Sequence, residues 1–126
     1  MKNKYIGKLS KKILGKYTNR IITEDVILTD ERKKHIYEDH PNDFNKIIEN
    51  IESTIINPDE ILEDSKNKDT IFIIKKLDIN NLNVVVKLNT SNDTQHPLNS
   101  IMTAWIIRDK NLKKLREKNA TIYKKE

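Results

Sequence analysis

The sequence predicts a single α+β domain in which one strand and two helices pack on a four-stranded antiparallel β-meander. Three observations indicate this class: helical spacing of apolar residues in the first half, Ile- and Val-rich runs between polar turns in the second half, and a length of 126 residues, which is one ordinary domain. Helices that are segregated from a meander cover one face of its sheet. The other face is then free to hold a site.

The N-terminal part of the chain divides into two segments of different character. Residues 1–19 are rich in Lys and weakly patterned, so we expect a loose basic arm there. The main domain then spans 20–126. It begins with a strand at 20–28 (RIITEDVIL), or with two short pieces broken near Glu24–Asp25.

Two helices follow this strand. Thr29 or Asp30 caps the first helix, which has acidic residues in its first turn and ends near Asp39. Pro41 fits the first turn of the second helix, which must end at the Asn57-Pro58 step. The second helix has an apolar stripe at helical spacing, made of Phe44, Ile47, Ile48, Ile51 and Ile55.

The rest of the chain is typical of a meander with a charged tail. Alternating and β-branched runs predict three long strands, at 70–77, 82–88 and 99–107. A shorter strand at 61–62 precedes them, and a polar loop is expected at 89–97. The tail 109–126 is highly charged, but its Leu112 and Leu115 can dock a short helix.

The charge balance favours polyanionic partners. The chain has 24 Lys and Arg against 19 Asp and Glu, a net charge of +5 and a pI near 9.3, which points first to nucleic acid. Many Lys-rich proteins are basic without binding RNA, so charge alone does not decide. The absence of Cys excludes disulfides and Cys-based zinc sites. No apolar run approaches membrane-spanning length, and the basic N-terminus has no signal-peptide core, so we expect no membrane partner.

The first predicted helix gathers residue types that suit acid–base chemistry. Arg32, His35 and Asp39 share one helix face, and Asp39 can orient the His35 ring. His40 lies just past the helix end, ahead of Pro41. RNA cleavage without a metal needs a base for the 2′-OH, an acid for the leaving 5′-oxygen and cations for the phosphorane. His can serve both proton roles near neutral pH, and Arg or Lys supplies the charge.

Two other interpretations of these histidines compete with catalysis. A His on a charged surface helix is more often inert than catalytic. A zinc site is less favoured, because His35 and His40 are five positions apart rather than the four of a helical metal pair. The third His, His96, is in the distant polar loop, so we expect no metal site and no cofactor.

Polar residues inside the predicted strands are the second set of candidates. Lys87 interrupts an apolar strand, where it either faces an active surface or extends along a sheet edge to water. On the last strand, alternation places Ile101 and Thr103 on one face and Ser100 on the other. Ser100 and Thr103 can therefore share a site only if the strand contains a β-bulge, or if Ser100 lies before the first hydrogen-bonded pair of the strand. Thr103 is either a satisfied core hydroxyl or a phosphate donor beside Lys87. Trp105 is either core or a stacking surface for a base.

Taken together, the segments TDERKKHIYEDHP, INPDEI, VVVKL and NSIMTAW resemble the phage-associated nucleases of the Barnase–EndoU–colicin–RelE superfamily, over roughly Ile21 to Leu115. The resemblance implies helices followed by a four-stranded antiparallel sheet. Carried over residue by residue, it implies a site lined by Arg32, His35, His40, Lys87 and Thr103, with Ser100 beside them. Asp39 and Trp105 join Ser100 as expected substrate-binding residues.

The resemblance also implies an activity: metal-independent cleavage of RNA, often tRNA, by a toxin. Such toxins act in the cytoplasm, are often delivered or secreted, and are sometimes paired with an acidic immunity or antitoxin protein. The acid and base assignments stay open, because superfamily members differ in their catalytic residues. Two alternatives remain: a basic RNA-binding module without catalysis, and a protein-interaction domain of the toxin/antitoxin type. The absence of an aromatic RNA-binding pair or a Gly-rich clamp counts against the first, and the basic pI counts against the second.

Overall fold

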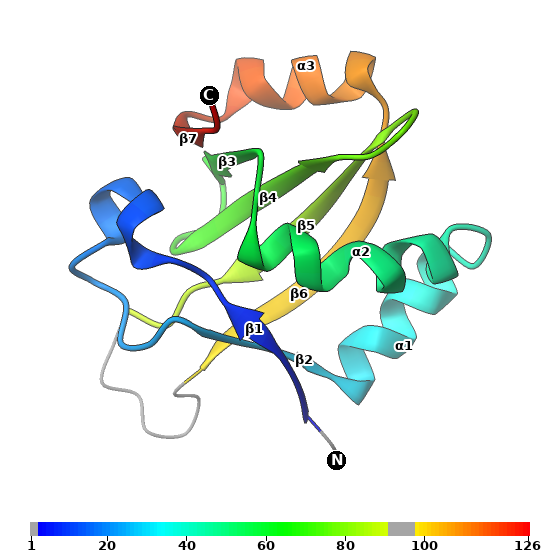
Figure 1. Ribbon diagram of the computed structural model, residues 1–126, viewed down its shortest axis with the longest axis horizontal. Helices are drawn as coiled ribbons and strands as arrows, with labels where there is room; N and C mark the ends of the chain where they lie inside the picture. Colours follow the sequence, from blue (N-terminus) through cyan, green and yellow to red (C-terminus); the bar gives the residue numbers. More distant parts are fainter. Residues whose placement is uncertain (1–2, 91–97) are drawn as a thin grey trace.

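The computed structural model describes residues 3–90 and 98–126, and this part of the chain forms three α-helices and one seven-stranded mixed sheet (Figure 1). The helices are α1 (Asp30–Asp39), α2 (Phe44–Ile56) and α3 (Asp109–Lys118). The strands are β1 (Asn3–Lys8), β2 (Asp25–Thr29), β3 (Glu60–Glu63), β4 (Thr70–Lys76), β5 (Asn81–Lys87), β6 (Asn99–Ile107) and β7 (Thr121–Lys124). The α+β class is confirmed. Most of the expected loop at 89–97 lies outside the described residues.

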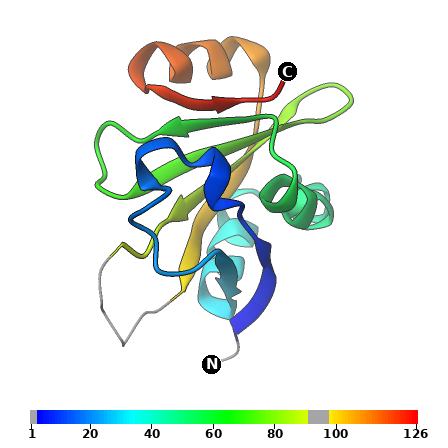
Figure 2. The ribbon, with the colours of Figure 1, turned by 60° about the vertical axis from the view of Figure 1, so that its left-hand side comes forward.

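The sheet is larger than the predicted four-stranded meander. Its strand order is β1-β2-β6-β5-β4-β3-β7. The strands β3 to β6 form the antiparallel meander that was predicted. β7 extends one edge by pairing with β3, below α3 in the view of Figure 2, and β2 extends the other edge by parallel pairing with β6. The prediction of a four-stranded sheet was wrong for two reasons. The predicted N-terminal strand, β2, joins the same sheet, and the edge strands β1 and β7 are short and mostly polar, so they lack a strong strand pattern.

The N-terminal residues 1–19 are not a loose arm where the structure describes them. β1 pairs antiparallel with β2. Two short 3₁₀ turns follow, η1 (Lys11–Ile13) and η2 (Gly15–Tyr17). Leu9, Leu14 and Tyr17 are buried in the main core. Single apolar side chains set between lysines have neither helical nor strand spacing, which is why the sequence pattern did not indicate their burial.

A polar cluster fastens this N-terminal segment to β3. Tyr17 Oη donates a 2.8 Å hydrogen bond to Glu63 Oε2, and Lys16 Nζ forms an ion pair with the same carboxylate. The hydrogen bonds from Lys16 and then Tyr17 lower the pKa of Glu63 from its ordinary value. Burial, and next the contact with Glu63, raise the pKa of Tyr17.

Changing Tyr17 to Phe removes one of these donors, and we expect the free energy of unfolding at neutral pH to fall by about 1–2 kcal/mol. A carboxyl group whose pKa is lowered by folding stabilises the fold above its unfolded pKa, and this contribution is lost as the pH falls through the folded pKa. The wild type should therefore lose stability below about pH 4.5, and Tyr17→Phe should lose less. Urea unfolding at pH 7 and in acid measures both effects. Equal acid-induced losses in the two proteins would contradict the role given to Glu63.

The local signals at the first two helices are confirmed. Thr29 is the N-cap of α1, since its Oγ1 accepts a 3.1 Å hydrogen bond from the Arg32 backbone N–H. Both helices end where the sequence predicted. One position differs, since Pro41 lies in the turn before α2 rather than in its first turn. β2 begins at Asp25, which agrees with the predicted alternative of a break near Glu24–Asp25 and not with one strand from residue 20.

Two apolar clusters lie on opposite faces of the sheet. Val84 and Val86 of β5 point into the main core, where α1 and α2 pack. Val85 points to the other face and belongs to a smaller cluster under α3. Leu112 and Leu115 dock α3 on that cluster, as their positions in the charged tail predicted. The face opposite α1 and α2 is therefore partly covered by α3, and polar residues of β5 and β6 lie beside the covered part.

Candidate functional site

The pairing of β5 with β6 brings three polar candidates together. Lys87 pairs with Ser100, and Val85 pairs with Thr103. Directly opposed residues of paired strands share a face, and Val85 and Lys87 share one by alternation. Lys87, Ser100 and Thr103 therefore lie on the α3 side of the sheet, together with Trp105. We call these four residues the open face: Lys87 is exposed and the other three are half-buried.

A β-bulge makes this arrangement possible. The register between β5 and β6 shifts so that Met102 has no partner of its own. The extra residue puts Ser100 on the same face as Thr103, which is the condition that the sequence set for both to join one site. It also sends Ile101 to the main core, where it is fully buried, so the expectation that Ile101 and Thr103 share a face was wrong.

The helix candidates lie on α1, which packs against β2 and β6 through the fully buried Ile36 (Figure 1). His35 has a side chain that is 53% exposed, and its Nε2 is 3.8 Å from Glu31 Oε1. Glu31 thus occupies the position near His35 that the sequence assigned to Asp39, which is exposed. His40 is half-buried and caps the helix, its backbone N–H donating to Ile36 O at 2.9 Å.

A hollow of about 410 Å³ opens beside the open face, between α3, the turn that follows β3, and the sheet. Thr103 and Trp105 line it from β6, and Leu115 and Lys118 line it from α3. Thr103 therefore borders a space that a ligand can enter. The α1 candidates do not line this hollow.

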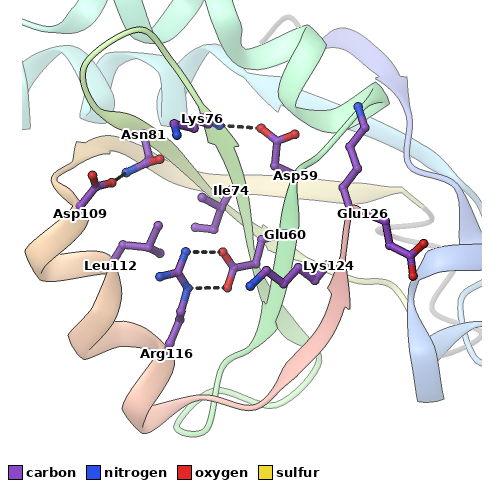
Figure 3. A pocket seen from close by; sticks show the side chains of 11 residues that line it. Asp59, Glu60, Ile74, Lys76, Asn81, Asp109, Leu112, Arg116, Lys124 and Glu126 are labelled. Atoms are coloured by element: carbon purple, nitrogen blue, oxygen red, sulfur yellow. Dashed lines mark hydrogen bonds and ion pairs between the residues drawn. The ribbon is translucent and has the colours of Figure 1, made fainter.

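A second hollow, of about 360 Å³, lies at the other flank of α3 (Figure 3). Two pairs of its charged and polar side chains are engaged with each other. Arg116 makes two hydrogen bonds to the buried Glu60, at 2.7 and 2.8 Å, and Asn81 Nδ2 donates to Asp109 Oδ1 at 2.8 Å. These contacts join α3 to β3 and β5, so we assign this hollow a structural role.

Changing Arg116 to Met keeps most of the side-chain stem but leaves the carboxylate of Glu60 without its main partner. We expect the free energy of unfolding to fall by about 1–3 kcal/mol, since the Arg116 side chain is itself 43% exposed and water can replace part of the pair. Denaturant unfolding of the single variant and of Glu60→Met/Arg116→Met separates the loss of the ion pair from the cost of burying an unpaired carboxylate. The double variant should recover part of the loss. A double variant less stable than the single one would contradict a burial cost at Glu60.

The comparison with known families fits this geometry. A family model described as "phage-Barnase-EndoU-ColicinE5/D-RelE like nuclease2" matches residues 4–124. The chain belongs to this nuclease family. The match spans all the described helices and nearly all the described strands, and it confirms the resemblance inferred from the sequence. Nucleic acid is therefore the substrate class of the nuclease. No curated protein and no solved structure shows a significant match.

The structure of the nuclease separates the predicted site residues into two groups. Lys87, Ser100 and Thr103 lie together on the open face, whereas α1, which carries Arg32 and His35 and ends at His40, packs on the opposite face of the sheet through Ile36. The structure therefore does not bring the two groups together. Sequence reasoning missed Lys118 and the polar turn at 64–67, because only the docking of α3 brings them beside the sheet.

Two further findings concern metals and membranes. Among the described residues, no three His, Asp or Glu side chains gather as a metal site requires, and His96 lies outside those residues. None of the described helices has the length and apolar character to cross a membrane.

Proposed function

We propose that this nuclease is a metal-independent endoribonuclease of the toxin type, with tRNA as its first candidate substrate. The observation that carries the proposal is the register of β5 with β6, which gathers a cation and two hydroxyl groups on one open face. Cations and hydrogen-bond donors aimed at a phosphate stabilise the charge that develops during phosphoryl transfer.

The sheet residues would hold the scissile phosphate. Lys87 pairs with Ser100 on one side and with Thr70 on the other, so its backbone is held in the sheet while its side chain is exposed to solvent. In the proposed reaction it stabilises the pentacovalent phosphorane, while Ser100 and Thr103 donate hydrogen bonds to the non-bridging oxygens.

The histidines of α1 would move the protons. One His removes the proton of the 2′-OH, the O2′ attacks the adjacent phosphorus, and the bond from phosphorus to the 5′-oxygen breaks. The other His gives a proton to that leaving oxygen. The products are a 2′,3′-cyclic phosphate and a free 5′-OH, and no metal takes part. His35 and His40 are the candidates that the sequence gives for these two roles. Because α1 packs on the face of the sheet opposite Lys87, substitution of the histidines and of Lys87 decides which face holds the scissile phosphate.

Incubation of the pure protein with total tRNA in excess EDTA tests the metal-independent step. We expect the cleavage rate to stay within about twofold of the rate without chelator. Loss of cleavage in EDTA with recovery on adding Mg²⁺ or Mn²⁺ would falsify the proposal. Binding of tRNA without any cleavage would instead favour a non-catalytic RNA-binding module.

An acidic immunity or antitoxin protein is the partner that suits this function. The net charge of +5 and the exposed Lys87 favour an acidic surface that covers the open face. Such a complex should associate more slowly as the salt concentration rises. A protein that is encoded next to this nuclease and binds it without inhibiting cleavage would not be this partner.

A further inference from the structure

We propose that the hollow between α3 and the open face is a binding subsite for one unpaired nucleotide next to the scissile phosphate, and that it holds the base by stacking rather than by reading its edge. We call this hollow the base subsite. The inference rests on the proposed function for the position of the scissile phosphate, whereas the subsite itself is defined by its lining residues.

The wall of the base subsite combines apolar surface with positive charge. Trp105 and Leu115 are half-buried and leave part of their surface open to the hollow, over the more deeply buried Phe72 and Val85. Aromatic and aliphatic side chains of this kind provide a platform for a planar base, and stacking tolerates any base because every base has a π-face.

Two polar side chains of the wall, Asp64 and Asn119, are already engaged with the protein. Asp64 Oδ1 accepts hydrogen bonds from the Lys66 and Asn67 backbone N–H groups, and Asp64 Oδ2 accepts from Asn67 Nδ2 at 2.8 Å. Asn119 Oδ1 accepts from Ser65 N, and its Nδ2 donates to Leu115 O. Because Asp64 and Asn119 bond to the protein, they fix the shape of the wall and are not available to read a base edge.

Two lysines give the hollow its charge complementarity to a nucleic acid. Lys66 and Lys118 line it from the turn after β3 and from the end of α3, and both are exposed. Asp64 is the one carboxylate among the lining residues, and its oxygens accept the hydrogen bonds described above. The lysines can therefore bind the phosphates that flank a seated base.

The position of the subsite links it to the scissile phosphate. Thr103 lines the hollow and pairs with Val85, which stands two residues from Lys87 on β5. Alternate residues of a strand are about 7 Å apart, a separation that one nucleotide can bridge. A base stacked in a duplex cannot enter such a hollow, so the expected substrate is a single-stranded loop or end whose base can turn outward.

The single Trp of the chain makes the subsite measurable without catalysis. The probe is a short single-stranded deoxyoligonucleotide, which lacks the 2′-OH and so cannot be cleaved by the proposed reaction. We expect saturable quenching of Trp105 fluorescence, and binding at least tenfold weaker for a duplex of the same length.

Lys66→Glu/Lys118→Glu should weaken binding about tenfold or more. Lys113→Glu/Lys114→Glu makes the same change of charge at exposed positions of α3 outside the hollow, and should weaken binding less than threefold.

A second measurement addresses the stacking platform. Trp105→Leu should weaken binding about tenfold when followed by the anisotropy of a labelled oligonucleotide, and its melting temperature shows whether the fold is intact. Changing the base identity along the oligonucleotide should alter affinity less than tenfold. Oligonucleotide binding without quenching, equal weakening by the two charge-reversal pairs, or a preference for duplex would each overturn the base subsite. Failure of RNA cleavage by the wild type would count against the proposed function and leave these binding results standing.

Discussion

Changing Lys87 to Gln should lower the single-turnover rate of RNA cleavage about 10²–10³-fold, in line with the loss of one group that stabilises the transition state. The Gln side chain is nearly as long and still polar, so the change removes mainly the positive charge. Because that charge is proposed to act on the phosphorane more than on the bound RNA, affinity for RNA should change less than tenfold. Melting temperature should hardly move, since Lys87 is exposed.

The matched control for this prediction is Lys113→Gln, which makes the same substitution on the exposed side of α3. Its cleavage rate should stay within about twofold of the wild type. Thr103→Val adds a test of the neighbouring hydroxyl: a slower rate at unchanged stability supports a phosphate contact, and a destabilised but fully active protein removes Thr103 from the site. A Lys87→Gln protein that cleaves RNA as fast as the control would place the phosphate elsewhere.

The second large effect is expected at the two histidines of α1. His35→Ala and His40→Ala should each lower the cleavage rate about 10²–10⁴-fold, the usual contribution of a general acid or base. Neither side chain belongs to the apolar clusters, and His40 caps α1 through its backbone rather than its ring. We therefore expect small changes in melting temperature for both variants.

Rate measurements from pH 5 to 8 distinguish catalysis from a structural role. The wild type should show a bell-shaped profile, and each variant should lose one limb of it. Lys34→Ala, at an exposed position of the same helix, serves as the control and should keep the full profile. If both His variants retain wild-type rates, the proton roles do not belong to α1, and His96 becomes the next position to change.

Local sequence signals were sufficient for much of the fold. Thr29 predicted the start of α1 because capping is a contact between residues three apart. The apolar stripe of α2 and the β-branched run of β5 predicted their elements because their spacing repeats within each segment. Leu112 and Leu115 predicted the docking of α3 for the same reason.

Features that depend on distant residues were not visible in the sequence. β1 and β7 are strands because of their neighbours in the sheet, β2 and β3, rather than because of their own alternation. The bulge at Met102 depends on the pairing of two strands, so the sequence could state it only as a condition. The pairing of β5 with β6 places Lys87 and Thr103 on one face, the arrangement that their proposed role requires. Lys118 became visible only when α3 was seen to pack beside the sheet.

The central claim is that the 2′-OH of the substrate is the nucleophile at the open face. The most direct measurement uses an RNA with a single 2′-deoxynucleotide on the 5′ side of the cleaved bond, followed by end-group analysis of the fragments. We expect the parent RNA to yield a 2′,3′-cyclic phosphate and a 5′-OH, and the substituted RNA to resist cleavage at that bond alone. Continued cleavage of the substituted RNA, leaving a 3′-OH and a 5′-phosphate, would contradict the account.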